Sequence, residues 1–245
     1  TEGLIRKTKK PLLAVKEKNE LPLIDPSEFR IDRDPAVDLF ISICDLTVDW
    51  APHLAVDAGA MKAALESDRI DPDLLFSALL NNQSEAMGQM AREIGVSEEH
   101  LATLTYLSIV PSIETGAQQL SVYLETMPEL KKGYCPICGN TPDLAFLDEA
   151  GKRHLKCTFC SHTWEAPRLG CVFCGDKDPE TQQYFYSDDE KEYRVNLCDH
   201  CHNYIKVVDL RQMVREFFPN LEMISTLHLD MKAREEGYKG LSMPV

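Results

Sequence analysis

Apolar residues recur at intervals of three and four along the first half of the chain, the spacing that places side chains on one face of a helix. These stripes stop near residue 130, and we interpret them as packing faces rather than as binding sites. They predict a bundle of four or five helices. The stripes comprise Val37, Phe40, Ile41, Cys44, Val48, Leu74, Leu75, Ala78, Leu79, Leu101, Leu104, Ile109, Ile113, Ala117, Leu120, Leu124 and Met127.

Short polar signals predict where these helices begin. An Asp-Pro pair stands at residues 34–35 and another at residues 71–72; Asp caps a helix start, and the Pro ring suits the first helical position. Ser97 precedes two glutamates, whose charge is favourable at the positive end of the helix dipole. We expect Pro111 to kink this last helix or to restart it, because Pro lacks a backbone N–H.

The second half of the chain has the pattern of short strands, in two similar copies. In the first copy, strand residues 144–147 precede a turn at 148–151, and residues 154–155 lead into a cysteine pair. The second copy has the same order, with strand segments at 183–186 and 193–197 around a turn. Each copy therefore predicts a β-hairpin between two cysteine pairs.

Eight of the nine cysteines form four C-x-x-C pairs, and two residues between cysteines let one tight turn present both thiolates to one ion. A pair at each end of a hairpin is the zinc-ribbon or rubredoxin-like plan. Each copy is so small that a bound metal would supply much of its folding free energy, on the order of 10 kcal/mol. The predicted ligands are Cys135, Cys138, Cys157 and Cys160 for one ion, and Cys171, Cys174, Cys198 and Cys201 for the second.

Other arrangements of these residues stay open. The second and third pairs could share an ion, although the segment between them holds no hairpin, or the pairs could cross over between the two copies. The last pair continues into His202 and matches the C-x-x-C-H pattern of covalent haem attachment, which belongs to exported proteins. Histidines near the pairs could replace a thiolate, but we expect them to be exposed or to support the ligands from outside: His154, His162, His200 and His202.

Three further residues have predicted packing roles. Cys44 lies apart from the pairs on an apolar stripe, and we expect a small buried core residue rather than a nucleophile. Trp164 and Tyr204 follow the second pair of each copy and are expected to cover the metal sites. Exposed aromatic anchors for a partner are the alternative.

The composition and charge of the chain argue against some classes of function. The chain has 245 residues, 44% hydrophobic and 27% charged, as in soluble globular proteins. Its net charge of −14 argues against a nucleic-acid partner, because phosphate binding depends on clustered Lys and Arg. No stretch reaches the ~20 apolar residues that span a bilayer, so we expect no membrane insertion. Paired cysteines, with no signal-peptide pattern after the basic start, predict a cytoplasmic protein.

These patterns predict an α+β protein: an N-terminal all-α helical bundle, tandem rubredoxin-like or zinc-ribbon modules, and C-terminal helices. Residues 1–30 are expected to form a basic, partly flexible arm, residues 31–130 the bundle, and residues 131–208 the two metal-binding modules. Residues 209–245 are expected to form a helical tail that packs back, from the apolar spacing of Leu210, Met213, Val214, Phe217, Leu227, Leu229 and Met231.

Several stretches of the second half resemble FdhE-type formate dehydrogenase accessory proteins. They are Gly133-Tyr134-Cys135-Pro136-Ile137-Cys138-Gly139, then Leu155-Lys156-Cys157-Thr158-Phe159-Cys160 with Trp164 and Arg168 after it, and Cys198-x-x-Cys201-x-x-Tyr204-x-Lys206. The ending is also similar, with Ser225-Thr226-Leu227-His228-Leu229-Asp230 followed by Glu236-Gly237-Tyr238. The resemblance covers residues from about 130 to 240, whereas the helical half offers no specific motif.

The resemblance implies a cytoplasmic maturation factor without enzymatic activity, a chaperone that binds the catalytic subunit of formate dehydrogenase and assists its assembly or activation. It also implies that the rubredoxin-like part binds iron, whereas two four-thiolate sites by themselves accept two ions of either iron or zinc. A second hypothesis is a rubredoxin-like electron-transfer protein that acts on a metalloenzyme partner. A third, a nucleic-acid-binding ribbon, conflicts with the acidity. The sequence does not indicate the oligomeric state.

Overall fold

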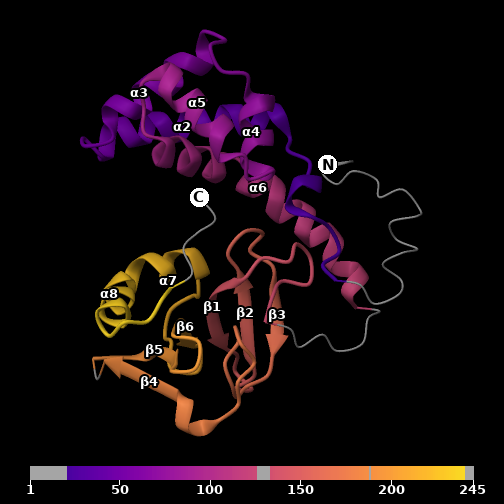
Figure 1. Ribbon diagram of the computed structural model, residues 1–245, viewed down its shortest axis with the longest axis vertical. Coiled ribbons are helices and arrows are strands. Elements are labelled where there is room, and N and C mark those ends of the chain that lie inside the picture. The colour runs from indigo at the N-terminus through magenta and orange to yellow at the C-terminus, as the bar shows by residue number, and fades with distance from the viewer. Residues whose placement is uncertain (1–20, 126–132, 188, 241–245) are drawn as a thin grey trace. The chain divides into compact units, whose positions relative to one another are not determined.

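The chain divides into two compact units, whose elements Figure 1 labels. This computed structural model describes residues 21–125, 133–187 and 189–240. Among these residues, one unit holds residues 24–119, and the other holds residues 21–23 together with those from 120 onward. Residues 1–20 of the expected basic arm, Met127 and the expected boundary near residue 130 lie outside the described residues.

The first unit is helical. Its elements are η1 (Pro26–Glu28), α2 (Arg33–Trp50), α3 (Ala55–Glu66), α4 (Pro72–Leu80), α5 (Ser84–Ile94) and most of α6 (Glu98–Leu124). The helix start at residues 71–72 is confirmed, because Asp71 is the N-cap of α4 and accepts a hydrogen bond of 2.9 Å from the N–H of Asp73. The start at residues 34–35 is wrong by two residues: α2 begins at Arg33, and Asp34 lies in its first turn.

The predicted stripes supply part of the core of this unit. Phe40, Leu75 and Leu101 are fully buried. Val48 is 41% exposed, because steps of four residues drift around the helix and place it about 120° from the buried Ala36. Leu74 is 64% exposed as well. The expected restart at Pro111 does not occur, since α6 continues through it.

Cys44 is a core residue, as predicted. It has no exposed surface, and burial raises the pKa of its thiol to about 11. The thiol therefore stays protonated near neutral pH, which makes it a poor nucleophile.

The end of the expected flexible arm is packed rather than solvated. In the helical unit, Ile24 and Phe29 are buried, and η1 has a capping box in which Glu28 accepts a hydrogen bond of 2.7 Å from the N–H of Asp25. In the other unit, the N–H of Leu23 donates to the carbonyl of Pro136 at 3.0 Å. The arm therefore does not extend through residues 23–29.

The second unit is built on one six-stranded sheet, with the strand order β3-β2-β1-β6-β5-β4. The predicted hairpins are present as the antiparallel pairs β1–β2 and β4–β5. Each hairpin gains a third strand that we did not predict, and β1 pairs in parallel with β6, so the two ribbons share one sheet. The strands are β1 (Pro142–Leu147), β2 (Arg153–Cys157), β3 (Thr163–Ala166), β4 (Gln182–Ser187), β5 (Glu190–Cys198) and β6 (Asn203–Asp209).

Strand register separates two faces of this sheet, because side chains alternate along each strand. On one face, Leu144 and Val195 belong to an apolar cluster with Leu229 of α8. Helices α7 (Pro219–Ser225) and α8 (Leu227–Glu235) follow the last strand, and α8 contacts β5 and β6. The opposite face carries Arg153 and Leu155. One face is therefore covered by helix, and the other is available to loops.

The helical tail begins later than predicted. Residues 210–218 form no helix, and α7 starts at Pro219. Pro219 disfavours a helical conformation at the residue before it, and Met213 and Phe217 pack against the apolar cluster from a non-helical segment. Among the described helices, none combines the length and the apolar character needed to cross a membrane.

Candidate metal centre

The four cysteine pairs share one local conformation. The residue after the second cysteine of each pair has a positive φ: Gly139 (78°), Ser161 (56°), Gly175 (75°) and His202 (54°). In three of the pairs its N–H bonds to the carbonyl of the first cysteine, at 2.8 to 3.1 Å. Glycine adopts this conformation readily, which explains its place in two of the turns. Each turn directs both sulfurs toward one point.

The first cluster joins the first and second pairs. The Sγ atoms of Cys135 and Cys160 are 3.6 Å apart, and Cys138 Sγ lies 3.5 Å from the sulfurs of both Cys157 and Cys160. All four sulfurs lie within 4.8 Å of one another. This is the grouping that the hairpin plan predicts.

The second cluster joins the third and fourth pairs. The Sγ atoms of Cys171 and Cys201 are 3.6 Å apart, and those of Cys174 and Cys198 are 3.8 Å apart. These four sulfurs also lie within 4.8 Å of one another. The alternative in which the second and third pairs share an ion is therefore not the arrangement of the fold.

The sulfur separations fit a bound ion. Four metal–sulfur bonds of ~2.3 Å in a tetrahedron place the sulfurs about 3.8 Å apart. A disulfide requires ~2.05 Å, and all nine cysteines are free. The two clusters could therefore bind two metal ions, one each.

Charge gives a second reason for a cation. Hydrogen bonds from the neighbouring thiols, first that of Cys135, hold the pKa of Cys138 far below its ordinary value. Burial raises the pKa of Cys135, and bonding among the sulfurs raises that of Cys160. Thiolates this close together repel one another unless a cation lies among them. A divalent cation would allow all four to ionise.

Neighbouring N–H groups favour thiolate in both clusters. The backbone N–H of Phe159 points at Cys157 Sγ, and that of Phe173 at Cys171 Sγ, each at 3.4 Å. Side-chain amides add one contact to each cluster, from Asn140 to Cys138 and from Gln182 to Cys198, both at 3.6 Å. Such donors orient the ligands of a metal and stabilise their charge.

The aromatic and histidine residues near the pairs stay outside the clusters. Neither group of candidate ligands in the described chain contains a histidine. His154 is paired with Asp148 at 2.9 Å, and His202 is exposed. Trp164 and Tyr204 are 7% and 5% exposed, so they are packing residues rather than exposed anchors.

Several contacts that hold the clusters were not predicted. Arg153, on β2, donates from both terminal guanidinium nitrogens to the carbonyl of Gly170 at 3.1 and 3.2 Å. Tyr238 donates to Asp199 between the cysteines of the fourth pair. These partners are 17 and 39 residues apart in the chain, and no local pattern marks them. The positive φ of Ser161 and His202 could have been predicted, because glycine stands at the same position in the other two turns.

Comparison with known proteins shows which proteins this chain resembles. Residues 134–168, which contain the first cluster and its strands, match the family described as FdhE, central domain. A protein FdhE homolog from Aquifex aeolicus is 32% identical over 150 residues, and one from Shewanella baltica is 30% identical over 165 residues. Over these residues the chain is similar to FdhE proteins. These alignments cover 60% and 64% of the chain, and the chain spans about half of the two FdhE homologs, 52% and 53% of their length.

A solved structure extends the FdhE likeness to the fold. The crystal structure of the FdhE protein from Pseudomonas aeruginosa superposes with a TM-score of 0.61, covering 100% of this chain and 82% of that one. At 18% identity this likeness shows a shared fold. The predicted α+β class, with a helical N-terminal part and cysteine ribbons, is confirmed. The family resemblance of the sequence motifs is confirmed as well.

Proposed function

We propose that this chain is a cytoplasmic accessory protein without enzymatic activity, which binds the catalytic subunit of formate dehydrogenase and assists its assembly or activation. One observation carries the proposal: the segment that builds the first sulfur cluster is the segment that matches the FdhE central domain. We infer the client, formate dehydrogenase, from the resemblance of the cysteine motifs to FdhE-type accessory proteins.

We further propose that the eight paired cysteines hold two metal ions. Sulfur separations of 3.5 to 3.8 Å support this assignment in both clusters. Four thiolates accept iron or zinc, and the family resemblance favours iron. Iron would supply one-electron chemistry, whereas zinc would act as a structural ion. In either case the chain's own contribution is two tight turns at each site.

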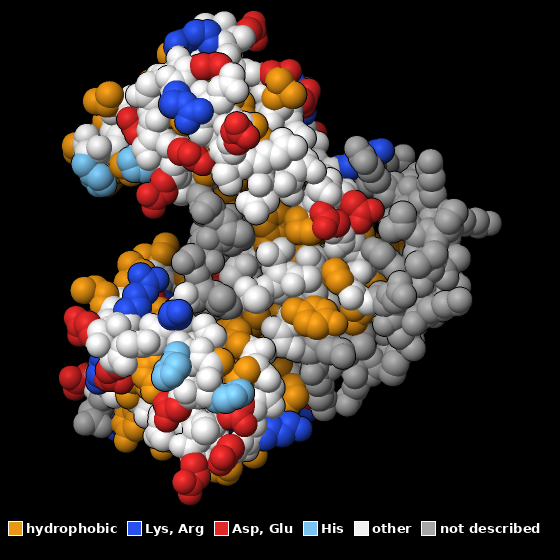
Figure 2. Space-filling model, viewed as in Figure 1, with side chains coloured by type: hydrophobic (Ala, Val, Ile, Leu, Met, Phe, Trp, Pro, Cys, Tyr) orange, Lys and Arg blue, Asp and Glu red, His pale blue; other side chains and the backbone are white. Residues whose placement is uncertain are grey.

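An exposed apolar surface on the ribbon unit is our candidate for the client contact. Six large apolar side chains between residues 214 and 231 are at least 50% exposed. Figure 2 shows apolar side chains along the region that α7 and α8 occupy in Figure 1. A group of exposed apolar residues of this kind marks a protein–protein contact. Its members are Val214, Phe218, Leu221, Ile224, Leu227 and Met231.

Anaerobic pull-down with the isolated catalytic subunit of formate dehydrogenase tests the proposal. We expect the metal-loaded protein to retain the subunit, and the double variant Leu221→Asp, Ile224→Asp to bind at least about tenfold more weakly. Val56→Asp is the matched control, because Val56 is 82% exposed but lies in the helical unit. Failure of the unaltered, metal-loaded protein to retain the subunit would contradict the function.

A second candidate is a rubredoxin-like electron-transfer protein. It is favoured by Cys174, which is exposed and would give a partner a close approach to the second ion. Iron-loaded protein should then have visible absorbance that a reductant bleaches reversibly. Isolation from its native cell as a colourless zinc protein would exclude this function and leave the accessory role.

A further inference from the structure

The two sulfur clusters differ in burial. In the first cluster the cysteines are 0%, 3%, 0% and 1% exposed, in chain order. In the second cluster only Cys198 is buried, at 2% exposed, while Cys171 and Cys201 are half-buried and Cys174 is exposed. Solvent and small molecules can therefore reach a sulfur of the second cluster but not one of the first.

The turns of the two clusters are also held differently. Ile137 and Phe159, between the cysteines of the first cluster, are 0% and 5% exposed. Backbone hydrogen bonds join both turns of the first cluster to other segments. The N–H of Leu23 donates to the carbonyl of Pro136, and the N–H of Thr158 donates to the carbonyl of Thr141. Opening the first cluster would disrupt this packing.

In the second cluster the third cysteine pair is the weakly packed one. Phe173 is half-buried, and Gly175 has open space around its α-carbon. The fourth pair is held more firmly, because Lys239 bonds to the carbonyl of His202 at 2.7 Å and Tyr238 bonds to Asp199. Movement of Cys171 and Cys174 therefore costs less than movement of any other pair.

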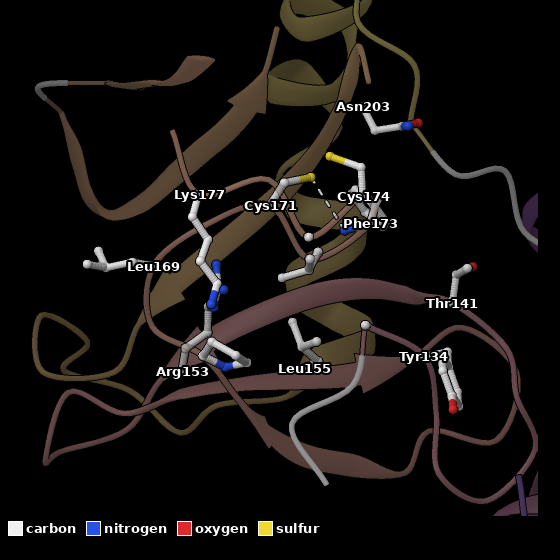
Figure 3. A pocket seen from close by; sticks show the side chains of 14 residues that line it. Tyr134, Thr141, Arg153, Leu155, Leu169, Cys171, Phe173, Cys174, Lys177 and Asn203 are labelled. Atoms are coloured by element: carbon white, nitrogen blue, oxygen red, sulfur yellow. Dashed lines mark hydrogen bonds between the residues drawn. The ribbon is translucent and has the colours of Figure 1, made fainter. Parts of the chain in front are cut away.

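A cavity of about 640 Å³ lies beside this third pair. Figure 3 shows the sulfurs of Cys171 and Cys174 next to one another, with Leu155 on the sheet beneath the loop. No cysteine of the first cluster is among the described residues that line it. A ligand of small-molecule size fits such a volume.

Two cations lie at this cavity. Arg153 is 3% exposed, bonds only to the neutral carbonyl of Gly170, and has a buried Nε–H without a partner among the described residues. Lys177 lines the same cavity and, like Arg153, lies against Gly170. These charges offset the negative charge of the sulfurs, so an anionic ligand is not repelled from the exposed side of the cluster.

We propose that the second cluster is an exchange site, which gives up and takes up its metal ion through this cavity with a small anionic chelating ligand, while the first cluster retains its ion. The inference rests on the proposed metal binding. In each step one bond between a sulfur and the ion breaks and one bond from the chelator forms. The freed thiolate takes a proton from water, and no electron is transferred.

Release kinetics test this difference in the full chain. The protein is saturated with zinc, its metal content is measured, and an excess of the anionic dye 4-(2-pyridylazo)resorcinol is added. We expect one equivalent to leave on the order of tenfold faster than the other. Cys174→Ser should abolish the fast phase and keep the slow one, and Cys138→Ser should do the reverse.

A second measurement uses only the unaltered protein, so it does not depend on whether a variant folds. During release from the unaltered protein, timed alkylation and mass spectrometry should label Cys171, Cys174, Cys198 and Cys201 before any cysteine of the first cluster. Release of both ions at one rate, or earlier labelling of the first cluster, would overturn the inference while leaving the metal assignment intact. A zinc-saturated protein with fewer than two ions would instead overturn the metal assignment and this inference with it.

Discussion

Arg153 and Gly170 join the two ribbons beside the second sulfur cluster. The guanidinium of Arg153 belongs to the first ribbon, and the carbonyl of Gly170 directly precedes Cys171 of the second. The contact sets the position of the third cysteine pair from outside its own ribbon. It also leaves a buried cation beside the sulfurs without a carboxylate partner in the described chain.

Replacing this arginine should weaken the second site alone. Arg153→Met keeps the length of the side chain but removes both hydrogen bonds to Gly170 and the positive charge. We expect zinc affinity at the second cluster to fall by about 10- to 100-fold, as for other residues that support metal ligands. Chelator competition measures this. Lys152→Met is the matched control, because Lys152 precedes the same strand and is exposed. Equal loss at both clusters would contradict the assignment.

Ser161 should tolerate glycine but not valine. Its φ of 56° lies in the left-handed region, where two of the other three ribbon turns have Gly139 and Gly175. A β-branched side chain is strained there, so we expect Ser161→Val to lower the free energy of unfolding by about 1–2 kcal/mol. Ser161→Gly should leave it within about 1 kcal/mol of the original. Urea unfolding of the metal-loaded proteins gives both values. Equal behaviour of the two variants would show that the turn relaxes.

Glu222 should be a main source of stability in the ribbon unit. Its carboxylate has no exposed surface and accepts hydrogen bonds from Tyr193 at 2.6 Å and from Arg215 at 2.7 Å. Removing one partner of a buried pair costs about 3–5 kcal/mol, and we expect the lower end for Glu222→Gln because Arg215 is half exposed. Thermal unfolding measures the loss. A change under 1 kcal/mol, well below the ~3 kcal/mol expected, would contradict it.

The same carboxylate predicts an acid-sensitive fold. Burial by itself raises the pKa of Glu222, but the hydrogen bonds from Arg215 and Tyr193 outweigh it and hold the pKa below its ordinary value. The stabilisation is therefore complete above the ordinary pKa of ~4.3 and is lost as the pH falls through the lower folded value. We expect the melting temperature to fall more steeply below that pH in the unaltered protein than in Glu222→Gln. Parallel curves would exclude Glu222 as the cause.

Metal removal should unfold the ribbons but not the helices. The helical unit has its own core, in which Phe40, Leu75 and Leu101 are fully buried. The ribbon sheet depends on four cysteine turns, which two bound ions would hold together in pairs. After prolonged chelation, hydrogen exchange should rise over residues 142–209 and stay low over residues 33–119. Retained protection of the strands would show that the metals are dispensable for the fold.

The features predicted from sequence are local ones. Asp71 caps the helix that it was expected to begin, and each predicted hairpin forms between the two pairs of its own cluster. Capping, hairpin turns and C-x-x-C spacing act within a few residues, so the sequence shows them directly. The grouping of the cysteines followed because a hairpin brings its own ends together.

Features that depend on distant segments were missed. The parallel pairing of Ala145 with Val207 joins strands far apart in the chain and leaves no periodic signal. Residues 210–218 have helical spacing, yet Met213 and Phe217 meet the apolar cluster from a non-helical segment. Packing between distant segments determines both the parallel strand pairing and the conformation of residues 210–218. It also determines which sulfur cluster is exposed.

The contact of Leu23 with Pro136 has a consequence for how the protein is made and divided. Pro22 lies 3.0 Å from the place that a Cβ at Gly139 would take, and Leu23 bonds to Pro136, so residues before the helices pack against the first cysteine turn. The helical unit is thus inserted within the ribbon unit, between residues 23 and 120. A ribosome would deliver one piece of the ribbon unit before the helices and the rest after them. A fragment that begins after the helices would therefore be an incomplete domain.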